Sequence, residues 1–266
     1  MPRRNRLVAA LFVAVALAVG AYALFANGTL NEPDEQWAER EPMGLMTSLP
    51  IYWGEGADMA TIASGDAPHP WMRGVIERHY LIQPLDALGA DIDPSADAPP
   101  ANPLAGMERL AIIQPRSISP ADNAALDEWV RKGGKLLLVL DPMLSGRYDY
   151  SLGDPRHPTV SALIPPVMAR WGLMMQYDDS QSFDVRMVDA VGDQIPTVMA
   201  GELLPFGEDG DEGRADCTIK PGGVVAVCTV GKGRATIVAD AAMFEQPGSE
   251  GVGDDTILAL LDAAFG

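Results

Sequence analysis

A strand–helix–strand unit in the middle of the chain constrains the fold more than any other feature of the sequence. Residues 109–114 (RLAIIQ) and 135–140 (KLLLVL) are short apolar runs, typical of strands that are buried on both faces of a sheet. Between them, Ser119 can cap a helix that ends at Gly133-Gly134. Such units join two parallel strands by a right-handed crossover. The sequence therefore predicts an α/β fold built around this pair.

Two cysteines flank a predicted β-hairpin in the C-terminal part of the chain. Gly222-Gly223 supplies a two-residue turn that places Cys217 opposite Cys228. Directly opposed strand residues have Cβ atoms about 4.5–5.5 Å apart, which a disulfide can bridge with a small adjustment. We expect the bridge if the chain folds in an oxidising compartment, and two free thiols otherwise.

The N-terminus carries an apolar segment long enough to cross a bilayer. Residues 7–26 contain no charged side chain and follow three arginines, Arg3, Arg4 and Arg6. Twenty residues in a helix span about 30 Å, the thickness of the hydrocarbon core. The charge asymmetry orients such a helix with its N-terminus in the cytoplasm. The alternatives are a signal peptide, cleaved after Ala21-Tyr22-Ala23, and a helix buried in the core.

This segment sets the predicted domain organisation and location. We expect a cytoplasmic tip at residues 1–6, a transmembrane anchor or signal peptide at 7–26, a linker at 27–44 and one periplasmic α/β domain at 45–266. The predicted location is the bacterial inner membrane, crossed once, with the C-terminal domain in the periplasm.

The chain is strongly acidic, with 37 Asp and Glu against 19 Lys and Arg and a formal net charge of −18. Nucleic-acid binding needs clustered basic side chains that neutralise phosphates. We therefore expect no nucleic-acid partner.

Polar residues follow several predicted strands, where ligands bind in open α/β sheets. These positions make up the candidate groove for a ligand or partner: Glu55, Gln114, Arg116, Asp141 and Asp240. Each of them also has an ordinary interpretation as a loop or cap residue.

No established catalytic, nucleotide-binding or metal-binding motif occurs in the sequence. A triad of Ser145, His157 and Asp141 can be imagined, but it requires contacts that a sequence does not show. We therefore predict no catalytic residues, no metal and no cofactor.

Three stretches resemble one family of proteins. Residues 110–142 (LAIIQPRSISPADNAALDEWVRKGGKLLLVLDP), 171–173 (WGL) and 231–244 (GKGRATIVADAAMF) resemble the periplasmic auxiliary component of gliding-motility-type ABC transport systems. The resemblance implies a flavodoxin-like or class I glutamine-amidotransferase-like three-layer sandwich, here with a C-terminal β-hairpin region and one N-terminal transmembrane helix. The catalytic G-x-C-x-G elbow of the amidotransferases is absent, and Asp255 replaces an Asn usual in the family.

The anchor, the missing motifs and the resemblance together lead to one functional expectation. It is a non-enzymatic, membrane-anchored periplasmic auxiliary or binding subunit of an ABC-type transporter or envelope complex. Its expected partner is an inner-membrane permease or another envelope protein, and the N-terminal helix would contact the membrane. The alternatives are a hydrolase or transferase of the amidotransferase-like superfamily with an unrecognised active site, and a periplasmic receptor for a small ligand.

Overall fold

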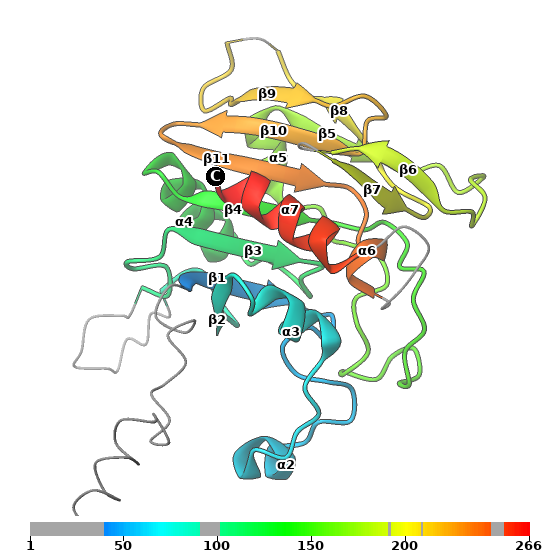
Figure 1. Ribbon diagram of the computed structural model, residues 1–266. Helices are drawn as coiled ribbons and strands as arrows, with labels where there is room; N and C mark the ends of the chain where they lie inside the picture. The colour runs from blue at the N-terminus through cyan, green and yellow to red at the C-terminus, as the bar shows by residue number, and fades with distance from the viewer. Residues whose placement is uncertain (1–39, 91–101, 191–192, 209, 246–252) are drawn as a thin grey trace, which may run out of the picture. The chain divides into compact units, whose positions relative to one another are not determined.

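A computed structural model describes residues 40–90, 102–190, 193–208, 210–245 and 253–266 (Figure 1). Its centre is a seven-stranded sheet in the order β2-β1-β3-β4-β11-β10-β9. The strands are β1 (Glu41–Thr47), β2 (Tyr80–Pro84), β3 (Arg109–Ile113), β4 (Lys135–Val139), β9 (Asp216–Ile219), β10 (Val225–Val230) and β11 (Gly233–Val238). The first five positions in this order, β2 to β11, are parallel, and β10 and β9 continue the sheet antiparallel.

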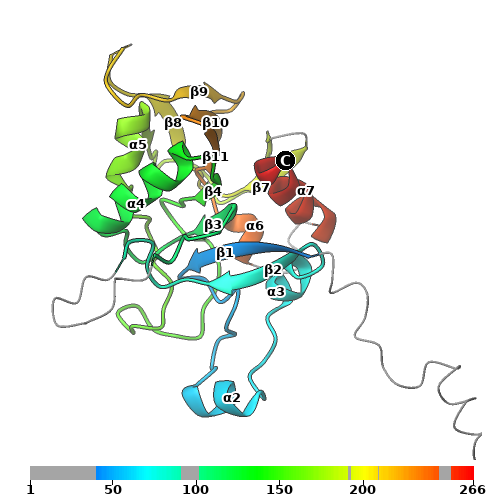
Figure 2. The ribbon, with the colours of Figure 1, turned by 90° about the vertical axis from the view of Figure 1, so that its left-hand side faces the viewer.

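Helices cover both faces of this sheet (Figure 2). On one face lie α4 (Pro120–Arg131) and α5 (Pro166–Trp171), and on the other lie α3 (Trp71–Ile76) and α7 (Asp254–Phe265). The short helix α6 (Ala242–Glu245) follows β11, and α2 (Met59–Ser64) stands away from the sheet (Figures 1 and 2). Every residue of β4 after Lys135 is fully buried, because helices pack on both of its sides.

Two small antiparallel sheets accompany the main one. In the first, β5 (Leu173–Gln176) pairs with β8 (Glu202–Pro205). In the second, β6 (Arg186–Asp189) pairs with β7 (Gln194–Thr197). The sequence did not predict β8, which is only four residues long and half exposed.

The predicted strand–helix–strand unit is confirmed. Strands β3 and β4 are parallel neighbours, with Arg109 opposite Lys135. The Ser119 hydroxyl accepts a hydrogen bond from the Asp122 N–H, and the Asp122 carboxylate accepts one from the Ser119 N–H, each at 3.1 Å. This reciprocal capping box satisfies two backbone donors that the first turn of α4 would otherwise leave unpaired.

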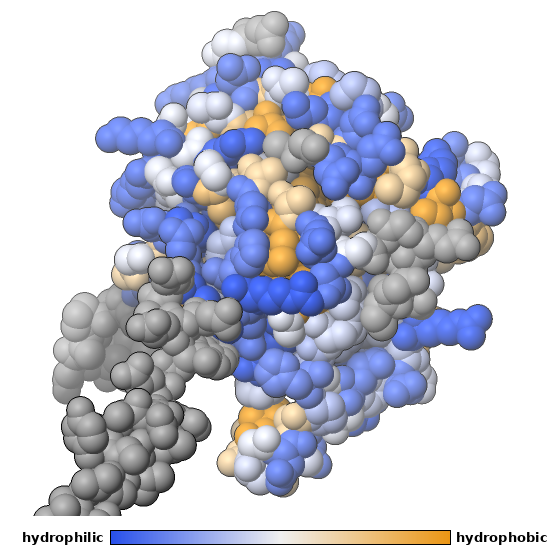
Figure 3. Space-filling view, viewed as in Figure 1, coloured by the Kyte–Doolittle hydropathy of each residue, from blue (hydrophilic) through white to orange (hydrophobic). Residues whose placement is uncertain are grey.

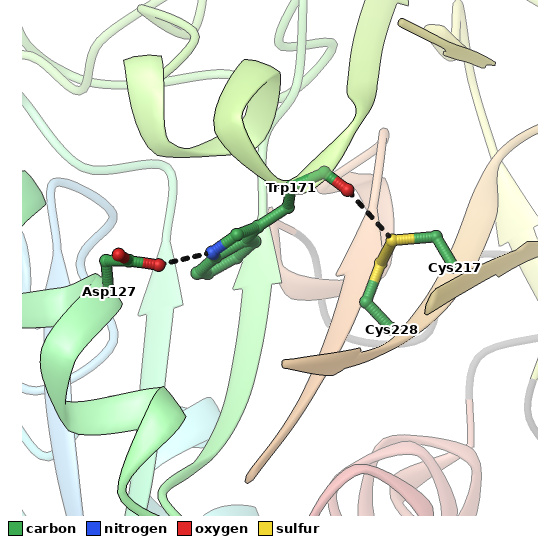
Figure 4. The surroundings of a disulfide bond; sticks show 4 residues. All are labelled: Asp127, Trp171, Cys217 and Cys228. Atoms are coloured by element: carbon green, nitrogen blue, oxygen red, sulfur yellow. Dashed lines mark hydrogen bonds between the residues drawn. A yellow bond between two sulfur atoms is a disulfide. The ribbon is translucent and has the colours of Figure 1, made fainter. Parts of the chain in front are cut away.

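The predicted hairpin and its disulfide are also confirmed. Cys217 lies opposite Cys228 in the β9–β10 register, and their sulfur atoms are bonded. The Cys217 sulfur lies 3.6 Å from the carbonyl oxygen of Trp171, whose indole N–H donates to Asp127 of α4 at 2.8 Å (Figure 4). The disulfide therefore ties the edge strand β9 to β10, next to a buried tryptophan that is itself held by α4.

The predicted fold class was wrong. A flavodoxin-like or amidotransferase-like three-layer sandwich with a C-terminal β-hairpin region was expected, but the structure has a mixed seven-stranded sheet, which the hairpin strands β9 and β10 extend. The reason is that β11 leaves one edge open, and β10 pairs with it over six residues. The first strand also begins at Glu41, inside the predicted linker.

None of the helices in the described part of the chain has the length and apolar content needed to cross a membrane. This finding stands against the predicted location, a single-pass protein of the inner membrane, and that prediction is corrected. The residues expected to form the anchor, 7–26, lie outside the described residues.

Candidate functional site

The carboxyl ends of the parallel strands carry two different groups of polar residues, one buried and one open. The buried group centres on Gln114, which directly follows β3 and has a left-handed backbone, with φ of 45°. Its side-chain carbonyl accepts from the Asp141 N–H at 2.8 Å, and its amide donates to the carbonyl oxygens of Asp141 (3.0 Å) and Thr159 (2.7 Å). Gln114 therefore joins the ends of β3 and β4 to the loop that contains Thr159.

Two buried aspartates follow the neighbouring strands β4 and β11. The Asp141 carboxylate accepts from the N–H groups of Met143 (2.7 Å) and Ala241 (2.8 Å). The Asp240 carboxylate accepts from those of Val198 and Ala242, both at 2.8 Å. Each side chain thus closes the turn that follows its own strand and also holds a second loop.

Burial changes the proton affinity of both groups. It raises the pKa of Asp141 to about 7, and the nearby charge of Glu245 adds to the effect, against the opposing hydrogen bonds from Ala241 and Met143. Burial raises the pKa of Asp240 as well, and the charge of Asp141 contributes next. A negative charge on Asp141 therefore disfavours the ionisation of Asp240.

Glu245, at the end of α6, completes this buried group. One of its carboxylate oxygens accepts from the N–H and hydroxyl of Ser145, and the other from the Gly146 N–H at 2.8 Å and the Tyr148 hydroxyl at 2.6 Å. Burial and the charge of Glu245 raise the pKa of the Tyr148 hydroxyl. All these carboxylate oxygens accept hydrogen bonds from the protein itself. The buried group therefore holds loops in place.

The imagined triad does not form. Ser145 donates to Glu245, the His157 Nδ1 lies 2.7 Å from the carbonyl oxygen of Pro158, and Asp141 contacts backbone N–H groups. In the described part of the chain, no cluster of three or more His, Cys, Asp or Glu side chains is arranged to hold a metal ion.

The open group lies at the carboxyl ends of β1, β2 and β3, where the structure forms a cleft of about 310 Å³. Aromatic and charged side chains line this cleft together. They are Tyr52, Trp53, Tyr150, Glu55, Asp86, Arg116 and Arg156. Such a mixture of ring faces and convergent polar groups is typical of small-ligand sites.

The walls of the cleft come from two loops that hold each other. The Tyr150 hydroxyl accepts from the Gly56 N–H at 2.8 Å, and Glu55 accepts from the Asp149 N–H at 3.1 Å. Arg116 donates to the carbonyl oxygen of His157 at 2.9 Å. The loop after β1 and the loop around residue 150 therefore form one continuous wall.

The aromatic rings of the cleft are held by their neighbours. The rings of Tyr52 and Trp53 meet edge to face, with centroids 4.8 Å apart. The Arg73 guanidinium stacks 4.1 Å from the Tyr52 ring, and that of Arg156 lies 4.1 Å from the Tyr150 ring. Trp53 nevertheless remains 45% exposed. Its ring is thus positioned but uncovered.

The five predicted groove residues separate between these two groups. Glu55 and Arg116 line the cleft, whereas Gln114, Asp141 and Asp240 are buried. Sequence reasoning placed all five at strand ends but gave no means of telling exposed side chains from buried ones.

Sequence reasoning also missed residues of both groups. The missed residues are Tyr52, Trp53, Tyr150 and Arg156 in the cleft and Tyr148 and Glu245 in the buried group. Half of them lie in the irregular loop after β4, where no periodic pattern marks a position.

Comparisons with known proteins give weak structural likenesses only. No family model matches the chain, and no curated protein matches it significantly. Among solved structures, Gan42B, a GH42 β-galactosidase from G. stearothermophilus, is 15% identical, with a TM-score of 0.41 and 84% of this chain covered. A β-galactosidase from Rahnella sp. R3 is 14% identical, with a TM-score of 0.40 and 84% covered.

A third neighbour is the exo-β-1,4-mannosidase Op5Man5 from Opitutaceae bacterium strain TAV5. It is 15% identical over 76% of this chain, with a TM-score of 0.38. The chain spans only 30–31% of the length of these three enzymes. TM-scores of this size carry neither a fold nor an activity over to the chain.

The function expected from the sequence was a non-enzymatic periplasmic subunit of an ABC-type transporter, whereas the neighbours found are glycoside hydrolases. The expected function and the expected lack of enzymatic activity find no support in these comparisons and are withdrawn. The resemblance to the gliding-motility family and the permease partner stay predictions, because no comparison bears on them.

Proposed function

We propose that the domain binds a carbohydrate in the cleft at the carboxyl ends of β1, β2 and β3. The observation that carries the proposal is Trp53, a large ring that is 45% exposed in a cleft which also holds Glu55 and Arg116. The contact of an exposed aromatic ring with water is unfavourable. A sugar that stacks its apolar face on the ring shields the ring from water.

The polar side chains of the cleft suit hydroxyl groups. Carboxylates such as Glu55 and Asp86 accept hydrogen bonds from hydroxyls, and the Arg116 guanidinium donates to them. Arg156 is already paired with Asp154, with the Nη2–Oδ2 distance at 2.8 Å. The cleft therefore offers both donors and acceptors without a large excess of positive charge, which favours a neutral polyol over a polyanion.

The size and place of the cleft point the same way. A volume of about 310 Å³ is at the small end of the range of ligand sites and suits one or two sugar rings. In open α/β sheets, ligands bind beyond the carboxyl ends of the parallel strands, where this cleft lies.

Calorimetric titration of the full chain with glucose, galactose, mannose, cellobiose and lactose tests the proposal. We expect at least one sugar to bind with a Kd below about 1 mM. Trp53→Ala should weaken that binding at least tenfold, and Arg116→Ala should weaken it measurably. The matched control is Phe206→Ala, which removes a ring of similar exposure (47%) that does not line the cleft.

Circular dichroism and thermal melting of each variant separate lost binding from lost folding. The proposal fails if no sugar binds, if inorganic phosphate or glucuronate binds where the neutral sugars do not, or if Phe206→Ala weakens binding as much as Trp53→Ala.

A further inference from the structure

An apolar stripe lies along the segment that leads into β6 and along β6 itself. Phe183, Val185 and Met187 are 67%, 42% and 45% exposed. Val185 directly precedes β6 and Met187 lies in it, so these two lie on one face, and Phe183 stands at a bend just before them. Val188, on the opposite face, packs against the core, so the stripe points away from it. Apolar side chains show on the surface around the β6–β7 hairpin (Figure 3).

Strand β6, which bears Met187, also has an open edge. Strand β6 pairs with β7 on one side, and no strand in the described part of the chain pairs with its other side. An open edge presents unpaired backbone N–H and C=O groups, which another strand can satisfy. Exposed charged side chains, Arg186 and Asp189, lie on β6, but large apolar side chains accompany them.

We propose that this edge pairs antiparallel with the same edge of a second copy of the chain. The pairing centres on Val185, which then faces Val185 of the second copy. The pairing extends β6 backward through residues 183–185, so that Phe183 faces Met187 of the second copy and Asp184 faces its Arg186. Apolar side chains thus meet apolar ones, and each copy places an acidic group against a basic one.

The symmetry of the pairing makes this register specific. Two identical antiparallel strands are related by a twofold axis, so the centre must fall on a residue. Centring the pair on Arg186 sets two arginines against each other, and centring it on Met187 sets Val185 against Asp189. Of these three registers, only the one centred on Val185 brings opposite charges together and keeps apolar side chains opposite one another.

The two charged side chains are available for such a pairing. Both Asp184 and Arg186 are exposed, and neither forms an ion pair within the described residues. Arg186 donates to the Gln181 amide oxygen on the surface. A short strand pair buries less area than a permanent dimer interface, so the association is a weak one, in the micromolar range.

Charge exchange at the two positions tests the register. Sedimentation velocity of the full chain at 10–200 µM, in one buffer and detergent for all variants, should show concentration-dependent dimers. Asp184→Arg and Arg186→Asp should each lower the dimer fraction at least tenfold, because each sets like charges opposite one another. An equimolar mixture of the two variants should restore it, since the two basic side chains of the first variant then face the two acidic side chains of the second.

A cysteine on the twofold axis gives an independent readout. In Val185→Cys, the two thiols face each other, and mild oxidation should form an intermolecular disulfide that removes two thiol protons and transfers two electrons to the added oxidant. Leu152→Cys, at a site 78% exposed and far along the chain from β6, is the control. The native cysteines, Cys217 and Cys228, are already bonded to each other.

These outcomes decide the proposal whatever the cleft binds. Faster cross-linking of Val185→Cys than of Leu152→Cys, together with rescue in the mixture, supports it. A monomer at 200 µM, equal cross-linking of the two cysteine variants, or a mixture that stays monomeric overturns it.

Discussion

Gln114 shows how much of the carboxyl edge depends on single buried side chains. Its amide donates to Thr159, 45 residues further along the chain. The sequence placed Gln114 at the end of a strand, which the structure confirms. Its burial could not be predicted, because it depends on a loop without periodic pattern that folds back over the strand ends.

The buried aspartates predict an unusual pH dependence of stability. Unfolded aspartate has a pKa of about 3.8, whereas burial raises that of folded Asp141 to about 7. The native state therefore binds more protons than the unfolded chain between about pH 4 and pH 7, and stability falls as the pH rises through this window. The slope from this one group is at most about 1.4 kcal/mol per pH unit.

Urea unfolding between pH 4.5 and 7.5 measures this slope. Asp141→Asn should flatten it while lowering stability at every pH, because both carboxylate oxygens accept backbone N–H groups and an amide can satisfy only one. An unchanged slope in this variant would show that other groups cause the dependence. Asp122 and Asp127 do not contribute to this slope. Their pKa values are lowered in the folded state, so they change stability only below this pH window.

At the scale of elements, two helices begin with the same kind of capping box, but we expect the loss of each cap to affect stability differently. Ser119 caps α4, which buries Leu126 and Val130, whereas Asp58 caps α2, which has no buried residue. Ser119→Ala should lower the free energy of unfolding by about 1 kcal/mol, because α4 folds with the core. Asp58→Ala should leave the global value unchanged and speed amide exchange at 59–64 only. A global loss from Asp58→Ala would mean that α2 is coupled to the core.

The disulfide should stabilise mainly the C-terminal edge of the sheet. Its sequence separation is 11 residues, for which the loss of unfolded-chain entropy corresponds to about 3 kcal/mol. The double variant Cys217→Ala/Cys228→Ala should lose about that amount. Amide exchange should rise first in β9, which has a neighbour on one side only. A rise that is uniform over the sheet would contradict this assignment.

The elements that could be predicted from the sequence are those with strong local signals. The β3–α4–β4 unit has apolar runs, a capping box and terminal glycines, and the hairpin has its Gly-Gly turn. Strand β8 and the loop after β4 have no such signals. The pairing of β11 with β4, which makes the sheet mixed, joins residues about 100 positions apart, and local patterns do not encode it.

For the whole molecule, sequence reasoning reached an α/β architecture but not its mixed sheet or its cleft. The candidate site depends on two loops about 100 residues apart that meet through Tyr150 and Gly56. Amino-acid composition cannot show that two loops far apart in the sequence contact each other. Net charge, in contrast, is a property of the whole chain that the sequence gives directly, and it bears on how two copies approach each other.

The charge of −18 predicts the salt dependence of the proposed self-association. Two such copies repel each other over the Debye length, which falls from about 30 Å at 0.01 M salt to about 10 Å at 0.1 M. The two exposed Asp184–Arg186 pairs contribute only about 0.2–1 kcal/mol each and are weakened by the same salt. Because the repulsion involves the whole chain, dimerisation should strengthen between 10 and 150 mM NaCl. Sedimentation velocity across this range of salt measures the change in dimerisation. A dimer that weakens steadily from the lowest salt would show that the local ion pairs outweigh the repulsion between the net charges.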